Sequence, residues 1–144
     1  MTIRVIRDRR APMRHEIHIG DYKLTTDLGV EAGGEGSGPT PHDLYDAALG
    51  ACQALTVLRY AKHRNIPVEG IEVSLERDAS QERAAIYRLG TELTLTGALS
   101  NAQREELLRV AQKCPIHKLM TEVTTEISTI LSEAAESPRT VSGP

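Results

Sequence analysis

One segment, residues 41–64, restricts the fold more than any other part of the sequence. Thr40 suits an N-cap, Pro41 suits the first helical position and Asp43 complements the helix dipole, so a helix is expected to begin here. Apolar residues then cover most of the helix circumference, which is typical of a helix buried on several sides. Small residues within 47–54 would let another helix approach closely. A long central helix with a helical partner is therefore expected.

Short strands and two further helices are expected around this central helix. Alternating apolar residues and β-branched runs predict the strands, and the turn residues between them predict hairpins. The expected strands are residues 1–7, 15–19, 22–26, 71–76, 86–95 and 125–131, and the expected helices are 101–113 and 115–120. Helices packed on antiparallel sheet make an α+β fold. Residues 1–131 are expected to form a single domain, with 132–144 as a disordered tail.

Residues 28–40 contain five glycines, which predicts an irregular segment before the central helix. No Gly-Lys-Ser/Thr sequence follows, so the segment is not a P-loop. No buried strand leads directly into it, so it is not a dinucleotide-binding fingerprint either. The segment is expected to be a flexible connector or a lid over a pocket.

Charge and composition restrict the partners. The formal net charge is −3, with 17 basic and 20 acidic residues interleaved, and the chain has no Phe and no Trp, which argues against nucleic acid as a partner. No apolar run approaches the roughly 18–20 residues that span a bilayer, and the N-terminus is too charged for a signal peptide. We therefore expect no membrane contact and a cytoplasmic location, where two cysteines are more often free, catalytic or metal-bound than a structural disulfide.

The two cysteines differ in their surroundings. Cys52 lies in the apolar helix, where burial would raise the pKa of the thiol and leave it inert unless a cation from another segment, with Arg14 or Arg7 as candidates, reaches it. Cys114 precedes Pro115 and could lie at the N-terminus of the next helix, where backbone amides lower a thiol pKa. The residues alone do not decide which thiol reacts first.

Three other interpretations of these residues remain open. Both cysteines could be small core residues, because free cysteine is often buried. A zinc site could combine Cys52, Cys114, His117 and His42, although no second closely spaced ligand pair accompanies them. A hydrolytic dyad could combine Cys114 with His117, although neither lies in a nucleophile-elbow sequence.

Two motifs resemble those of the OsmC/Ohr family of osmotically induced and organic-hydroperoxide-resistance proteins. The first runs from Gly38-Pro39-Thr40-Pro41-His42-Asp43-Leu44 to Ala47-Ala48-Leu49-Gly50-Ala51-Cys52, and the second is Cys114-Pro115-Ile116-His117-Lys118. The resemblance covers most of residues 1–131 in element order, and it is closer to the OsmC-like branch than to Ohr proper.

The resemblance implies an OsmC-like intertwined homodimer, with antiparallel sheets wrapped around long central helices and two active sites at the subunit interface. It also implies a peroxiredoxin-like thiol peroxidase that acts in oxidative stress. Cys52 would attack an organic hydroperoxide and become a sulfenic acid, and Cys114 would resolve it as a disulfide. A dithiol such as a lipoylated protein would reduce this disulfide. No cofactor and no metal are expected.

One position departs from the family pattern. Ohr-type members carry a glutamate ten residues before the first cysteine, where it holds the activating arginine, and this chain has His42 there with Asp43 beside it. A histidine cannot hold a guanidinium as a carboxylate does, so either Asp43 takes this role, or the arginine is placed differently, or peroxidase activity is weak. Arg14 is the candidate for the activating arginine. The rival hypothesis is a stress-associated or small-molecule-binding dimer that keeps the fold and the thiols but turns over little peroxide.

Overall fold

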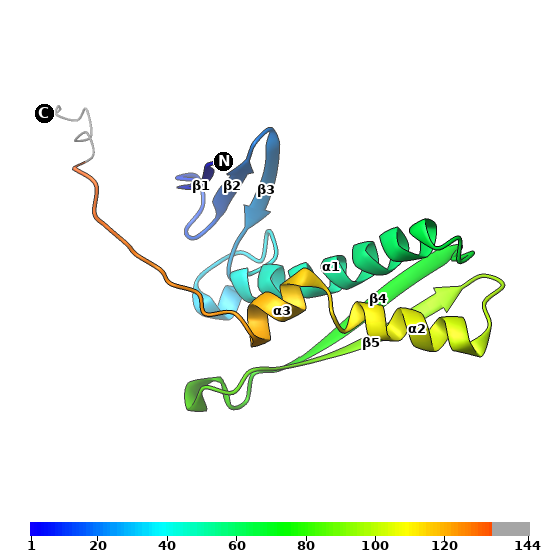
Figure 1. The fold of residues 1–144 in the computed structure, drawn as a ribbon. Helices are drawn as coiled ribbons and strands as arrows, with labels where there is room; N and C mark the ends of the chain where they lie inside the picture. The colour runs from blue at the N-terminus through cyan, green and yellow to red at the C-terminus, as the bar shows by residue number, and fades with distance from the viewer. Residues whose placement is uncertain (134–144) are drawn as a thin grey trace, which may run out of the picture.

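The computed structural model describes residues 1–133, and it shows an α+β chain with two antiparallel sheets and three α-helices (Figure 1). The elements are β1 (Ile3–Arg7), β2 (His15–Ile19), β3 (Tyr22–Thr26), the 3₁₀ turn η1 (Val30–Ala32), α1 (Pro41–His63), β4 (Gly70–Asp78), the 3₁₀ turn η2 (Glu82–Ala84), β5 (Arg88–Thr96), α2 (Asn101–Ala111) and α3 (Pro115–Thr121). The predicted central helix is confirmed, and seven of the other eight predicted elements lie within a few residues of their expected bounds.

The start of α1 is fixed by a capping box. The Thr40 hydroxyl accepts a hydrogen bond from the Asp43 backbone N–H at 3.1 Å, and the Asp43 carboxylate accepts one from the Thr40 N–H at 2.9 Å. Pro41 occupies the first helical turn, where a missing N–H costs nothing. The helix therefore begins at the residue that the sequence indicates.

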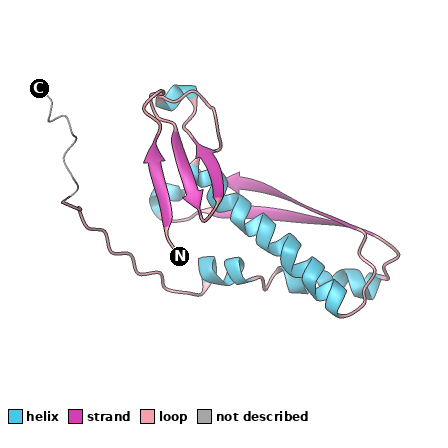
Figure 2. Cartoon of the chain, turned by 90° about the horizontal axis from the view of Figure 1, so that it is seen from above, coloured by secondary structure: helices cyan, strands magenta, loops and turns pink. Residues whose placement is uncertain are grey.

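The core lies between α1, α2 and the hairpin of β4 and β5. Its most buried members come from the second half of α1, from α2 and from the turn after α1: Val57, Ala61, Ile66, Leu107 and Ala111. Gly50 lets the helix lie close to the hairpin, because a Cβ atom there would lie 2.5 Å from Leu75 Cδ1. Figure 2 shows the two long strands beside α1. The apolar face of the β4–β5 hairpin is thus covered within one chain.

The sheet of β1, β2 and β3 stands beside the start of α1 and is not packed along that helix (Figure 1). Its register places the apolar residues of all three strands on one face: Ile3, Val5, Ile17, Ile19, Tyr22 and Leu24. Four of them, Ile3, Val5, Tyr22 and Leu24, are exposed. The small residues Ala47 and Ala51 of α1 are exposed as well. Within residues 1–133, no other element buries the apolar face of the N-terminal sheet or the small residues Ala47 and Ala51.

The strand predicted over 125–131 is wrong for this chain, since residues 123–133 form no regular element. A strand needs an edge with which to pair, and within residues 1–133 this segment pairs with neither sheet. Ile127, Ile130 and Leu131 consequently lie exposed. Most of the predicted tail, 134–144, lies outside the described residues, and the single-domain assignment stays a prediction.

The glycine-rich segment is more strongly anchored than a flexible connector would be. The carboxylate of Asp27, a residue 2% exposed, accepts hydrogen bonds from the backbone N–H groups of Leu28, Glu35 and Ser37 and from the Ser37 hydroxyl. These bonds lower the pKa of Asp27 to about 2, with the Ser37 hydroxyl as the largest cause. One buried carboxylate therefore organises the loop before α1.

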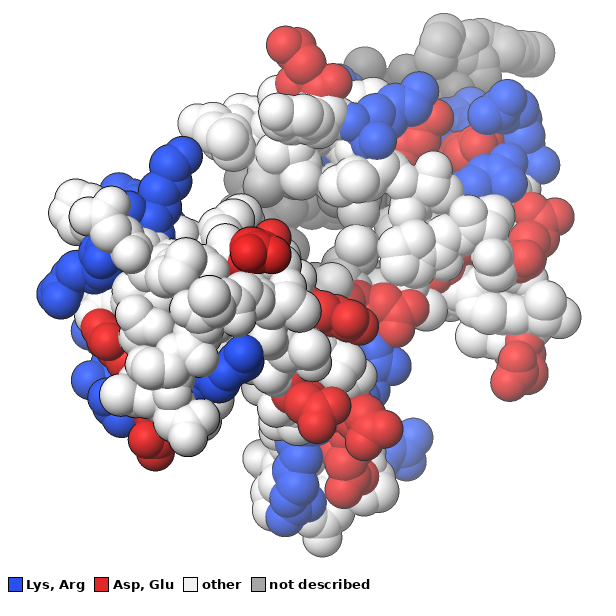
Figure 3. Space-filling model, turned by 90° about the vertical axis from the view of Figure 1, so that its right-hand side faces the viewer, with Lys and Arg blue, Asp and Glu red and all other residues white. Residues whose placement is uncertain are grey.

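The surface is mixed in charge. Figure 3 shows acidic and basic side chains interspersed over one face of the molecule, with apolar and neutral residues between them. No helix within residues 1–133 is both long and apolar enough to cross a membrane.

Candidate functional site

The structure brings the two cysteines together from elements 62 positions apart in the chain. Cys52 lies half-buried in α1, and Cys114 is the N-cap of α3 with no exposed surface. The Ile116 N–H donates to Cys52 Sγ at 3.4 Å, and the His117 N–H donates to Cys114 Sγ at 3.3 Å. The first turn of α3 therefore holds both sulfur atoms through backbone donors.

The solvent exposure of the two thiols is the reverse of what the sequence predicts. Cys114 lies at a helix N-terminus as predicted, yet burial raises the pKa of this thiol, and contact with Cys52 raises it further. The hydrogen bond from the His117 N–H opposes this rise without cancelling it. Cys52, which the sequence placed in a protected interior, is the thiol that solvent reaches. Cys52 is therefore the more accessible nucleophile, and Cys114 is a shielded second thiol.

A cavity of about 640 Å³ lies beside the thiols. It begins at Leu49, about one helical turn before Cys52, and it reaches His117, whose amide holds Cys114. Its lining mixes apolar residues with tyrosines and with basic or polar residues: Leu49, Ala85, Leu89 and Met120, then Tyr45 and Tyr87, then Arg88, His117 and Thr121. Such a cavity suits an organic molecule that has both an apolar and a polar part.

Asp43 holds an arginine, although not one predicted from the sequence. Arg77 Nη2 lies 2.6 Å from Asp43 Oδ1, and Arg77 Nε lies 2.5 Å from Asp46 Oδ2. The Tyr87 hydroxyl donates to Asp46 Oδ1 at 2.7 Å. The two carboxylates raise the pKa of Arg77, and the Arg77 guanidinium lowers the pKa of Asp43.

This ion-pair cluster lies away from the thiols. At about 100° per residue, Asp43 is about 180° around α1 from Cys52. Arg77 is consequently held against the face of α1 that meets β4, and the cluster joins α1 to the hairpin. The sequence contained a signal for it, because the alternation of Ile71, Val73 and Leu75 points the next alternate residue, Arg77, toward the helix.

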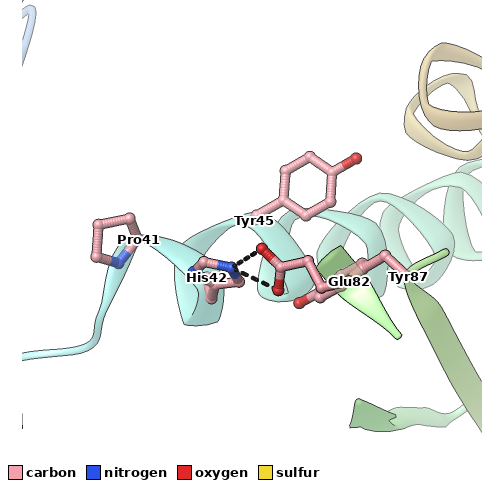
Figure 4. A pocket seen from close by; sticks show the side chains of 5 residues that line it. All are labelled: Pro41, His42, Tyr45, Glu82 and Tyr87. Atoms are coloured by element: carbon pink, nitrogen blue, oxygen red, sulfur yellow. Dashed lines mark hydrogen bonds and ion pairs between the residues drawn. The ribbon is translucent and has the colours of Figure 1, made fainter. Parts of the chain in front are cut away.

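His42 faces the tip of the β4–β5 hairpin. Its Nε2 atom lies 3.2 and 3.1 Å from the two carboxylate oxygens of Glu82, and its ring lies near that of Tyr87 (Figure 4). These residues, with Pro41 and Tyr45, line a second cavity of about 380 Å³. His42 thus binds a carboxylate from another segment, whereas the family glutamate at this position would bind an arginine.

Arg14 and Arg7 do not reach Cys52 within the chain. Arg14 pairs with Asp8 at 3.0 Å and with Glu35 at 3.5 Å. Arg7 donates to the Pro12 carbonyl at 3.5 Å. In the part of the chain that the structure describes, Cys52 Sγ has hydrogen-bonding contacts with the Ile116 N–H and, at 3.8 Å, the Thr56 hydroxyl, and none with Lys or Arg. The assignment of Arg14 as the activating cation stays a prediction.

The sequence model of the family described as OsmC-like protein matches residues 34–128, which hold both cysteines and every element from α1 to α3. The chain belongs to the OsmC-like family.

Solved structures of this family share the fold. An organic hydroperoxide resistance protein OsmC from Legionella pneumophila is 25% identical with a TM-score of 0.61, and the match covers 84% of this chain and 88% of that one. OhrB of Bacillus subtilis, an organic hydroperoxide resistance protein, is 25% identical with a TM-score of 0.56, covering 85% and 92%. An OsmC like protein from Mycoplasma pneumoniae is 15% identical with a TM-score of 0.68, covering 85% and 87%. No curated protein matches the sequence.

The other interpretations of the cysteines find less support in this OsmC-like chain. Among residues 1–133 no three His, Cys, Asp or Glu side chains are gathered as a metal site would require, and His42 is bound to Glu82. The hydrogen bond between His117 and Cys114 comes from the His117 backbone N–H, so it does not supply a hydrolytic dyad with a ring nitrogen as base. Cys114 is buried as a core residue would be, but it contacts Cys52, a thiol that is partly exposed to solvent, and core packing alone does not require such a contact.

Proposed function

We propose that this protein is a thiol-dependent peroxidase that reduces organic hydroperoxides. The observation that carries the proposal is the contact between one accessible thiol and one buried thiol, close to a cavity whose lining includes Leu49 and His117. Membership of a family that includes organic hydroperoxide resistance proteins supports it.

The first step uses Cys52 as the attacking thiolate. Its sulfur attacks the terminal oxygen of the hydroperoxide, the O–O bond breaks, and the alkoxide takes up a proton and leaves as an alcohol. Cys52 is oxidised to a sulfenic acid while the peroxide is reduced. The N–H group of Ile116 donates a hydrogen bond to this sulfur at 3.4 Å.

The second step uses Cys114. Its thiolate attacks Cys52 Sγ, the S–O bond breaks, the leaving hydroxide takes up a proton to form water, and a Cys52–Cys114 disulfide remains. Because the two thiols already lie in contact, little movement is required. A dithiol such as a lipoylated protein then returns both cysteines to thiols in the cytoplasm.

The functional unit that we propose is an intertwined homodimer. The exposed apolar face of the N-terminal sheet and the exposed small residues of α1 would cover each other between two chains. Arg14 of the second chain would then supply the cation that Cys52 lacks within its own chain. Mixing Arg14→Ala with Cys52→Ser tests this arrangement. If the site is shared, part of the peroxidase activity returns on mixing; if mixing restores nothing, Arg14 does not act across the interface.

The alternative function is a small-molecule-binding dimer with little peroxidase activity. The absence of a cation bonded to Cys52 in the described part of the chain favours it, as does His42 at the position of the family glutamate. The cavity beside the thiols would then be a binding site rather than a reaction site.

Intact mass spectrometry separates the two functions. Reduced protein receives one equivalent of cumene hydroperoxide, with Cys52→Ser and Cys114→Ser as matched variants. A peroxidase loses two hydrogens within seconds, and Cys114→Ser gains one oxygen on Cys52. If both thiols remain reduced for minutes, the binding function is the better description.

A further inference from the structure

A second groove reaches the thiol pair from the other side along α1. It encloses about 380 Å³ between α1, α2 and the start of α3, and its lining is Thr56, Arg59, Tyr60, His63, Val110 and Pro115. Thr56 contacts Cys52 Sγ at 3.8 Å, and Pro115 directly follows Cys114. The groove therefore lies next to the thiol pair, although neither cysteine lines it.

Two residues give this groove a basic character. Arg59 and His63 follow Cys52 by seven and eleven positions, so at about 100° per residue both lie within about 20° of Cys52 around α1. Side chains on a helix lean toward its N-terminus, which directs the long Arg59 side chain back toward Cys52. No Asp or Glu is among the lining residues.

One lining residue, Tyr60, is already bonded to a carboxylate. Glu106 accepts a hydrogen bond from the Tyr60 hydroxyl, and Arg64 lies over the Tyr60 ring at 5.0 Å. Arg59 takes part in no ion pair within residues 1–133. Its charge is therefore available to a bound molecule.

We infer that this groove, which is lined by Arg59, admits the reductant, and that it favours a dithiol that carries an anionic group. The inference rests on the proposed disulfide chemistry and adds a separate entrance for the reductant. The larger cavity, which reaches the thiol pair from Leu49 and His117, then serves the hydroperoxide, and the groove lined by Arg59 serves the electron donor.

The order of attack follows from exposure. Cys52 has exposed surface and Cys114 has none, so the incoming thiolate attacks Cys52 Sγ. The Cys52–Cys114 bond breaks, and its electron pair leaves on Cys114, which takes up a proton. The second sulfur of the reductant then attacks the mixed disulfide and releases Cys52, so the reductant leaves as a cyclic disulfide and the protein gains two electrons and two protons.

Dihydrolipoate and dihydrolipoamide provide a matched pair of probes, because they carry the same dithiol and differ in one carboxylate. Full-length protein is first oxidised with diamide, and the rate of disulfide reduction by each probe is measured at low salt. We expect dihydrolipoate to react about three- to tenfold faster in the wild type, as one exposed ion pair allows. The preference should fall toward one in about 1 M salt.

Arg59→Gln should reduce this preference to about one, whereas Arg83→Gln, which makes the same charge change at the distant turn η2, should retain it. A wild-type preference near one, or a preference that survives Arg59→Gln, would overturn the inference. Because diamide forms the disulfide, the result does not depend on the peroxide step. Failure of cumene hydroperoxide to oxidise the protein would reject the proposed peroxidase and leave the measured charge preference as evidence on the groove.

Discussion

The N-terminal sheet (β1–β3) and the body of the molecule, formed by α1, α2 and the β4–β5 hairpin, show the same apolar alternation. They differ in what covers their apolar faces. In the body, Val57 and Leu107 have no exposed surface because α1, α2 and the β4–β5 hairpin enclose them. In the N-terminal sheet, Val5 is 59% and Tyr22 is 77% exposed, although both lie on the apolar face. Alternation therefore indicates which face of a sheet is apolar, but it does not show whether that face is buried by the same chain.

The largest expected effect concerns the body. Leu107→Ala removes a fully buried side chain from the core and should lower the free energy of unfolding by about 3–4 kcal/mol. The matched change Leu108→Ala, at an exposed position of α2, should cost less than about 1 kcal/mol. Urea denaturation at several protein concentrations measures both. Equal losses from the two variants would mean that the core is not where the structure places it.

The N-terminal sheet should respond through association. Leu24→Asp places a charge on its apolar face and should weaken self-association roughly a hundredfold, about 2.7 kcal/mol. Lys23→Asp places the same charge on the opposite face and disturbs the surface pair with Glu16, so its effect on association should be small. Sedimentation equilibrium measures the dissociation constants. If Leu24→Asp leaves the association state unchanged, this face is not the interface between two chains.

Local signals in the sequence predict the fold elements well. The N-cap at Thr40 and the alternation of Ile71, Val73 and Leu75 each depend on neighbouring residues, and both appear as expected. The strand expected over 125–131 is absent, and this segment pairs with neither sheet of the described chain. Periodicity carries no information about such a long-range partner.

The candidate site was predictable only in part. The spacing and context of Cys52 and Cys114 indicate a thiol pair, and the structure places the two in contact. Their relative exposure could not be derived, since it depends on how α3 packs against α1. Arg77 was missed because its role depends on pairing between β4 and α1, and the direction of Arg59 follows only once the groove is known.

The junction between the two regions offers a smaller test. Thr40→Ala removes the side-chain acceptor of the capping box and should lower the free energy of unfolding by about 1 kcal/mol. Because the cap belongs to α1, the loss should be the same at all protein concentrations at which the association state is constant. If Thr40→Ala weakened association but left the free energy of unfolding unchanged, Thr40 would contribute to the N-terminal sheet and its interface instead of to α1.

The smallest expected effect is a local one in the loop that joins the sheet to the body. The pKa of Asp27 is lowered from 3.8 to about 2, so its carboxylate stabilises the folded loop fully above about pH 4. That contribution is lost as the pH falls from about 4 toward 2, because the bonds from Ser37 and Glu35 require the ionised group. Amide shifts of Ser37 followed by NMR should titrate with a midpoint near 2, and Asp27→Asn should abolish this titration. A midpoint near 3.8 would mean that the carboxylate is not bound by the loop, and the sheet would then be joined to the body by a flexible connector.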